Sequence, residues 1–184
     1  SDAELEAKAA EFVKENAENP ELSVASVKDA LDGAKDIIAE AVSDDAYIRG
    51  RVRNSLATRG LITTKNTKEE DSVYSMYYEY SEPVARIPSH RILAINRGEA
   101  EKFLKVSVSG DDEFILGYIK NHFVKGKGSC STLVVEAIED AYKRLIFPSV
   151  EREIRNMLTE RASDSAIGVF ADNLEPLIMQ PPVK

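Results

Sequence analysis

Residues 139–162 read EDAYKRLIFPSVEREIRNMLTERA, and the pattern that they begin continues to about residue 178. Apolar side chains recur there in steps of three and four, at Val150, Ile154, Met157, Leu158, Ala162, Ala166, Val169, Phe170, Leu174, Leu177 and Ile178. This spacing is typical of one side of an α-helix, with charged residues opposite. At 1.5 Å per residue the helix would be about 40 Å long, so we predict a spine on which other elements pack. The side chains that we expect to be buried are Ile154, Leu158, Val169 and Phe170.

The composition is that of a globular protein of one or two domains. The chain has 184 residues, of which 43% are hydrophobic and 30% charged. Its single cysteine, Cys130, excludes an internal disulfide and fits a reducing compartment. No apolar run reaches the roughly 18 residues of a membrane helix, and no secretion signal is recognisable, so we expect a cytoplasmic protein without membrane contact. The net charge of −8 means that any nucleic-acid surface must be a local basic cluster.

Helical spacing extends over most of the chain. It predicts helices over residues 3–17, from Ser23 or Ser26 to 42, over 46–59, from Asp111 or Asp112 to 123, and over 131–145. Ser43-Asp44-Asp45 is expected to end the second of these helices and cap the third, and Gly60 to follow the third as a left-handed residue.

The middle of the chain is less regular. Residues 61–65 are short and β-prone, and residues 104–108 alternate apolar and polar side chains, which is a strand pattern. Between them we predict a helix over residues 73–80, an extended segment at 84–87, and a short helix capped by Ser89. The predicted fold class is therefore all-α, a multi-helix scaffold with a long C-terminal spine helix and at most a tiny two-stranded β element.

The sequence gives little indication of catalytic residues or of a metal site. His90 and His122 have no cysteine or histidine at ligand spacing, and no acid/base pair stands out. Cys130 is read either as a buried or idle thiol or as a nucleophile. The loop that starts at Lys125 is either a plain connection or a phosphate loop without the Walker spacing. Four tyrosines could either pack in the core or stack on nucleic-acid bases: Tyr74, Tyr77, Tyr78 and Tyr80. We expect no catalytic residue, no metal, no cofactor and no enzyme activity.

Two basic clusters are the candidate sites for nucleic acid or a partner. One contains Arg51 and Arg53, with Arg49 and Arg59, on the third predicted helix; the other contains Arg86, His90, Arg91 and Arg97 around the Pro88–Arg91 turn. Arginine forks and free amides at a helix start can bind phosphate, whereas arginines at helix contacts pair with acidic neighbours. For Arg91 we predict a carboxylate partner in another segment that pins the turn to the spine. The alternative is that Arg91 faces solvent with Arg86 or Arg97 and binds phosphate.

Long strings of this sequence resemble a known family. Four strings are similar to the bacterial Tex family of RNA-binding transcription accessory proteins. They are SEPVARIPSHRILAINRGE at residues 81–99, LKVSV at 104–108, DGAKDIIAE at 32–40 and the spine sequence at 140–162. The resemblance is continuous from about residue 25 to the end of the chain. It adds a family to a pattern that by itself indicates only a helical scaffold.

The resemblance implies an organisation and a role. Residues 1–110 would be a Tex N-terminal-like helical region and 111–184 a central region, with a helix-turn-helix-like part. The long helix would lead to a YqgF domain, helix-hairpin-helix motifs and an S1 domain, all of which we expect this chain to lack. The S1 domain is the family's main binder of nucleic acid, RNA or DNA, and RNA polymerase is a further implied partner.

We therefore expect a non-enzymatic scaffold fragment that binds nucleic acid weakly by itself. The alternatives are a protein-interaction module without direct nucleic-acid contact and a cryptic nuclease fragment that uses the Lys125 loop.

Overall fold

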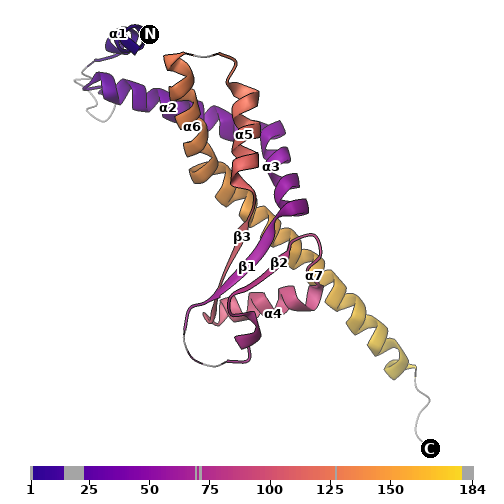
Figure 1. Ribbon diagram of the computed structural model, residues 1–184. Coiled ribbons are helices and arrows are strands. Elements are labelled where there is room, and N and C mark those ends of the chain that lie inside the picture. The colour runs from indigo at the N-terminus through magenta and orange to yellow at the C-terminus, as the bar shows by residue number, and fades with distance from the viewer. Residues whose placement is uncertain (1, 15–22, 69, 71, 127, 180–184) are drawn as a thin grey trace, which may run out of the picture. The chain divides into compact units, whose positions relative to one another are not determined.

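The computed structural model describes residues 2–14, 23–68, 70, 72–126 and 128–179 (Figure 1). The chain divides into two compact units. Unit 1 consists of Ser1–Val52 and Asp112–Ser149, and unit 2 of Arg53–Asp111 and Val150–Lys184. Each unit is thus built from two segments that are far apart in sequence. The division into residues 1–110 and 111–184 stays a prediction.

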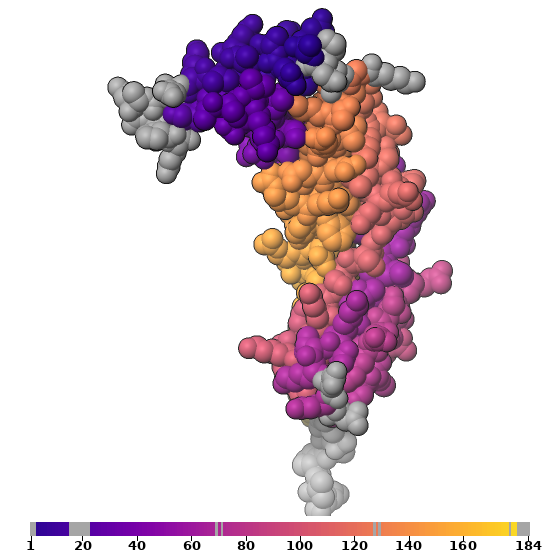
Figure 2. Space-filling view, turned by 60° about the vertical axis from the view of Figure 1, so that its left-hand side comes forward, coloured from indigo at the N-terminus to yellow at the C-terminus, as the bar shows by residue number. Residues whose placement is uncertain are grey.

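Unit 1 is a group of helices. It contains α1 (Asp2–Ala10), α2 (Val27–Asp44), the first part of α3 (Ala46–Arg59), α5 (Asp112–Phe123), α6 (Ser129–Asp140) and the π-helical η3 (Ala141–Ile146). Helix α6 packs against α2 and α5, and Figure 2 shows the orange surface of α6 beside the salmon surface of α5. Among the described helices, none is both long and apolar enough to span a membrane.

Side-chain caps set the starts of α2 and α3. Ser26 Oγ accepts the backbone N–H of Asp29 at 3.1 Å. Asp45 Oδ1 accepts the N–H groups of Tyr47 and Ile48 at 2.9 and 3.0 Å. Such caps satisfy amides that lack a partner in the first turn and stabilise a helix by about 1 kcal/mol. Of the two predicted starts of α2, the structure selects Ser26, and the predicted cap of α3 within residues 43–45 is confirmed at Asp45.

The core of unit 1 is mostly apolar and contains a buried phenol. Its fully buried side chains include Val42, Ile48, Val52, Ile119, Ile138 and Ile146. The Tyr142 hydroxyl donates to Asp112 Oδ1 at 2.6 Å. Burial, with this hydrogen bond second, raises the pKa of Tyr142, so the buried phenol stays protonated.

Pro148 gives a physical reason for the π-helical turn. A proline in a helix lacks the N–H that would bond four residues back, and its ring crowds that carbonyl. The wider turn of η3 lies directly before α7 (Phe147–Ile178), in which Pro148 is the second residue. Single π-turns of this kind are a common way for a helix to absorb a local irregularity.

Unit 2 contains a three-stranded antiparallel sheet, so the predicted limit of two strands is wrong. The strands are β1 (Leu61–Asn66), β2 (Tyr80–Pro83) and β3 (Leu104–Ser109), in the order β2-β1-β3. Leu61 pairs with Pro83 on one side and with Ser109 on the other. One face of the sheet is buried, through Ile62, Thr64, Leu104, Val106 and Val108. The two strands predicted at 61–65 and 104–108 are confirmed.

Strand β2 occupies part of the region predicted as a helix over residues 73–80. Only a single 3-10 turn, η2 (Ser75–Tyr77), forms there. Glu79 has a positive φ of 51°, which turns the chain into β2. The Thr64 hydroxyl donates to the Tyr77 carbonyl and ties the turn to β1. Tertiary contacts therefore override the helical spacing of the tyrosines.

Helix α4 (Ser89–Ala100) packs closely on β3. A Cβ atom on Gly98 would lie 2.7 Å from Leu104 Cδ1 and 3.1 Å from Tyr74 Cδ1. Real Cβ atoms do not approach other carbons so closely, so glycine allows this contact.

The beginning of α4 differs from the prediction. Pro88 is its N-cap residue and Ser89 its first residue, with no side-chain cap bond, so the Ser89 cap is wrong. Residues 84–86 form a turn instead of an extended segment, because the Arg86 and Ile87 N–H groups both donate to the Pro83 carbonyl at 3.0 Å. Gly60 is also not left-handed. A Cβ there would lie 2.3 Å from the Leu56 carbonyl oxygen, which is what requires glycine.

Helix α7 is buried over only part of its length. Val150, Ile154, Leu158 and Ala162 are at most 1% exposed, which confirms the predicted burial of Ile154 and Leu158. Val169 and Phe170 are 59% and 66% exposed, so their predicted burial is wrong. Nothing among the described residues of unit 2 covers these two side chains.

Candidate functional site

The predicted basic residues fall in both units. Arg51 belongs to unit 1, where its guanidinium carbon lies 4.7 Å from the centre of the Tyr118 ring. Arg53 belongs to unit 2 and is exposed on α3. The second cluster lies in or just before α4, with exposed side chains at Arg86, His90 and Arg97. Their contact with nucleic acid stays a prediction.

Arg91 has a partner. Its Nη1 donates to both carboxylate oxygens of Glu82 at 3.1 Å and to the Tyr80 hydroxyl at 3.0 Å. The Tyr80 hydroxyl donates to Glu82, and this hydrogen bond, followed by Arg91, lowers the pKa of Glu82. Burial, followed by the Glu82 contact, raises the pKa of Tyr80. The predicted carboxylate partner in another segment is confirmed, but it ties α4 to β2 and not to the spine.

A different arginine ties this turn to α7. Arg161 Nη2 donates to the Ile87 carbonyl at 2.8 Å, just before α4 begins. The turn is therefore joined to the spine by Arg161, and the prediction that Arg91 makes this connection is wrong. The two residues are 74 positions apart, so no local pattern in the sequence indicates this contact.

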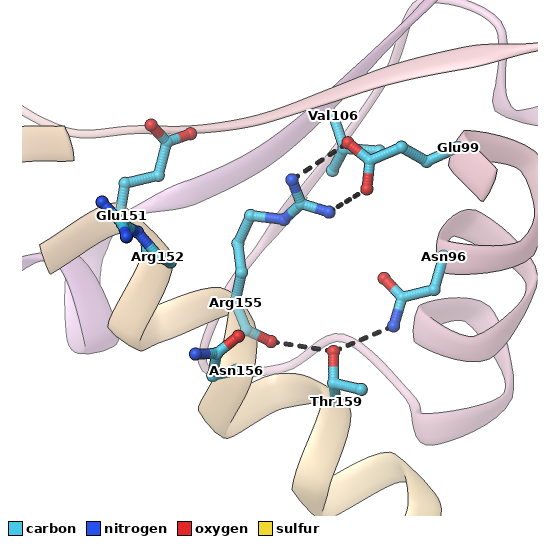
Figure 3. Close-up of a pocket in the computed structure, with 8 residues that line it drawn as sticks. All are labelled: Asn96, Glu99, Val106, Glu151, Arg152, Arg155, Asn156 and Thr159. Atoms are coloured by element: carbon cyan, nitrogen blue, oxygen red, sulfur yellow. Dashed lines mark hydrogen bonds and ion pairs between the residues drawn. The ribbon is translucent and has the colours of Figure 1, made fainter. Parts of the chain in front are cut away.

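A polar groove lies between α4, β3 and α7 in unit 2. Its volume is about 410 Å³, and Figure 3 shows α7 on one side, α4 on the other and β3 above them. Its lining residues are Asn96, Glu99, Val106, Glu151, Arg152, Arg155, Asn156 and Thr159. Most of these side chains are polar, in contrast to the apolar core beside them.

Hydrogen bonds across the groove hold its walls together. Both guanidinium ends of Arg155 meet the Glu99 carboxylate in a bidentate pair (Figure 3), with Nη1 3.0 Å from Oε1. Asn96 Nδ2 donates to Thr159 Oγ1 at 2.9 Å. Glu151 accepts the N–H of Val108 at 2.7 Å, at the edge of β3 that faces away from β1. A free strand edge invites pairing with another chain, so Glu151 also protects this edge.

These contacts indicate a structural joint and offer little for catalysis. The two carboxylates, Glu99 and Glu151, are both engaged by protein donors. No group of three or more metal-ligating side chains occurs among the described residues. Sequence reasoning missed the joint, because Glu99 and Arg155 are 56 positions apart and each resembles an ordinary surface charge.

The second candidate is a surface on the last turns of α7. We call Ile167, Phe170, Leu174 and Ile178 the distal stripe; they are 66%, 66%, 38% and 69% exposed. Their spacing of three, four and four places them on one side of the helix. At about 100° per residue, this side is roughly opposite the side that carries the buried Val150, Ile154, Leu158 and Ala162.

Because the two stripes lie on opposite sides, the distal stripe does not continue the core of unit 2. Scattered exposed apolar residues are normal, but a contiguous apolar patch marks a contact surface. The sequence shows this stripe, yet periodicity does not reveal that it lacks a cover.

Comparisons with known proteins assign the family. A family model described as Tex central region-like matches residues 1–170. The chain belongs to this family. Over its whole length, this Tex central region is 42% identical to YdcI of Bacillus subtilis strain 168, and the match covers 26% of that protein.

Further relatives carry informative names. The transcriptional accessory protein Tex of Neisseria gonorrhoeae is 32% identical over 97% of this chain and 24% of that protein. The human S1 RNA-binding domain-containing protein 1 is 28% identical over 87% of this chain and 18% of that protein. The chain thus spans about a quarter or less of the length of these relatives.

Proposed function

We propose that this chain is a helical scaffold fragment of a Tex-like transcription accessory protein. In this proposal the distal stripe of α7 carries a further part of the longer polypeptide. The observation that supports it is an exposed apolar stripe on the side of α7 opposite the core of unit 2. Burying a side chain as large as Phe or Leu is worth about 1.5–3 kcal/mol, so four such residues would anchor a domain.

The length of the relatives supports the choice of occupant. Proteins that match this chain are about four times as long, since the match covers 26% and 24% of two of them. A covalently linked domain has a high effective concentration near the stripe, so it competes well with a separate protein.

For the whole protein we propose binding of nucleic acid, RNA or DNA, mainly through an S1 domain outside this chain. RNA polymerase would be a further partner, and the protein would act in the cytoplasm. The names of the Neisseria and human relatives support the role in transcription and the link to RNA. We also propose that part of the chain is helix-turn-helix-like. We expect no enzyme activity, so a divalent-metal-dependent assay with RNA and DNA substrates should release no cleavage product.

Hydrogen–deuterium exchange tests the scaffold role. In the 184-residue chain, amides of residues 163–178 should exchange quickly, because nearly all described side chains of this helical segment are exposed. In the longer polypeptide we expect the same amides to exchange at least about tenfold more slowly, since a docked domain must leave before they open.

Matched variants locate the effect on the stripe. In the longer polypeptide, Phe170→Ser with Leu174→Ser should remove the protection. Val169→Ser, also exposed but on the opposite side of α7, should retain it. Equal protection in both chain lengths would contradict the proposal. Protection that accompanies dimer formation by the 184-residue chain would assign the stripe to a second copy instead.

A further inference from the structure

The open face of the sheet carries an unusual pair of like charges. Lys65 on β1 lies directly opposite Lys105 on β3, and both side chains are exposed. Directly opposed residues on neighbouring antiparallel strands lie only about 4.5–5.5 Å apart, and like charges in this arrangement destabilise a sheet. Neither lysine forms an ion pair with another described residue.

Two further lysines extend this charge beyond the strands. Lys68 and Lys102, with Lys105, line a hollow of about 450 Å³ at the same end of the sheet. The Lys68 ammonium lies 4.4 Å from the centre of the Phe103 ring, which holds its side chain over unit 2. Glu99 also lines the hollow, but its carboxylate is bonded to Arg155. Three lysines thus line one hollow in a protein whose net charge is −8, and Glu101, beside Lys102 in sequence, interacts with Tyr74.

Hydroxyl groups lie next to the lysine pair on the same face. Thr63 and Ser107 form the next pair of opposed residues on this side of the sheet, with their hydroxyl oxygens 2.9 Å apart. Most of this face is polar, with Leu61 its large exposed apolar side chain.

We propose that the open face at Lys65 and Lys105, together with the adjoining hollow at Lys68 and Lys102, binds the sugar–phosphate backbone of a nucleic acid; we call the surface formed by these four lysines the lysine face. Phosphate contacts in proteins come mainly from lysine, arginine and hydroxyl side chains, and they need no sequence-specific pocket. A bound phosphate turns the repulsion between Lys65 and Lys105 into two attractive contacts. This inference rests on the nucleic-acid binding proposed above, but the lysine face is separate from the distal stripe and does not depend on the scaffold role.

An acidic protein is the competing class of partner, and the composition of the face argues against it. Protein–protein interfaces are depleted in lysine and rely on buried aromatic or arginine anchors. The lysine face offers lysines and hydroxyls, and the ring of Phe103 beside it is already in contact with Lys68 and Tyr74.

Fluorescence anisotropy with a labelled single-stranded RNA of about 20 nucleotides tests the proposal, between about 50 and 200 mM KCl. The wild-type chain should bind with a salt dependence, and Lys65→Gln/Lys105→Gln should bind about tenfold more weakly at the lower salt. Each phosphate contact on a single strand contributes about 0.7 to the slope of log K against log salt, so this slope should fall by about 1.4.

The control removes the same charge elsewhere. Lys28→Gln/Lys143→Gln changes two exposed lysines of unit 1 and should leave the salt slope unchanged. An equal loss of RNA affinity in both double variants would overturn the proposal, because net charge alone would then explain binding. Absence of RNA binding by the wild type at the lower salt would overturn the proposal as well. Displacement of the RNA by polyglutamate, added at an equal concentration of negative charge, would also overturn it, because an acidic protein would then bind the face equally well.

Melting of the variants separates binding from folding. Lys65→Gln/Lys105→Gln should melt at the same or a higher temperature than the wild type, because the repulsive pair is gone. If this variant fails to fold, Lys68→Gln/Lys102→Gln, outside the strands, must weaken RNA binding in its place. Phe170→Ser/Leu174→Ser should leave RNA binding unchanged, so failure of the scaffold role and failure of the lysine face are distinguishable.

Discussion

The two halves of α7 are similarly apolar but differ in what covers them. Val150, Ile154, Leu158 and Ala162 are buried within unit 2, whereas every member of the distal stripe is at least 38% exposed. The cover of the first half includes α4 and β3, which come from residues 89–109 and are joined to α7 through Arg155 and Glu151. Periodicity shows which sides of a helix are apolar, while burial depends on segments far away in the sequence.

The largest expected difference between the halves is in stability. Leu158→Ala should lower the free energy of unfolding by about 2–5 kcal/mol, because it removes buried methyl groups and leaves a cavity. Leu174→Ala, the same change in the distal stripe, should alter it by less than about 0.5 kcal/mol. Urea denaturation followed by circular dichroism measures both. Equal losses would show that the distal stripe is packed in this chain, which would remove the contrast.

A change in α4 tests whether the first half of α7 depends on its cover. Gly98→Ala should destabilise the chain by about 1–3 kcal/mol, because the new Cβ would lie 2.7 Å from Leu104 Cδ1 and force α4 away from β3. Hydrogen exchange should accelerate in α4, β3 and residues 150–162, but not in residues 163–178. Gly33→Ala in α2, where a Cβ would meet no atom within 4 Å, is the matched control and should not destabilise. Faster exchange along the whole of α7 would show that both halves share one cover.

Local sequence rules predicted the helices well and the sheet incompletely. The caps at Ser26 and Asp45 and the alternation at residues 104–108 are local signals, and all three are confirmed. Strand β2 has four residues and pairs only through contacts with β1, so neither length nor periodicity indicates it. The burial of Val169 and Phe170 was predicted from spacing alone, and spacing carries no information about a missing partner.

The candidate sites were less accessible to sequence reasoning than the helices. Arg91 was recognised because its neighbours are basic, but its partner Glu82 became clear only with the turn between β2 and α4. The lysine face depends on strand register: Lys65 and Lys105 are 40 positions apart, and the pairing of β1 with β3 sets them opposite each other. A register shift of one residue would place them on different faces.

The smallest expected effect concerns the Glu82–Arg91 pair of the packed region and its dependence on pH. The hydrogen bond from Tyr80 and the charge of Arg91 hold the pKa of Glu82 below its ordinary value. A carboxyl with a lowered folded-state pKa contributes stability above its unfolded pKa of about 4.3, and this contribution is lost as the pH falls through the folded value. Glu82→Gln should therefore melt slightly below the wild type at neutral pH, and the two curves should converge below about pH 4. Glu175→Gln, an exposed carboxyl in the distal half of α7, should follow the wild type throughout. If the melting temperature of Glu82→Gln stayed below that of the wild type at low pH, the Glu82 side chain would act through packing. If Glu175→Gln lowered the melting temperature by the same amount, the distal half would have ionic partners of its own.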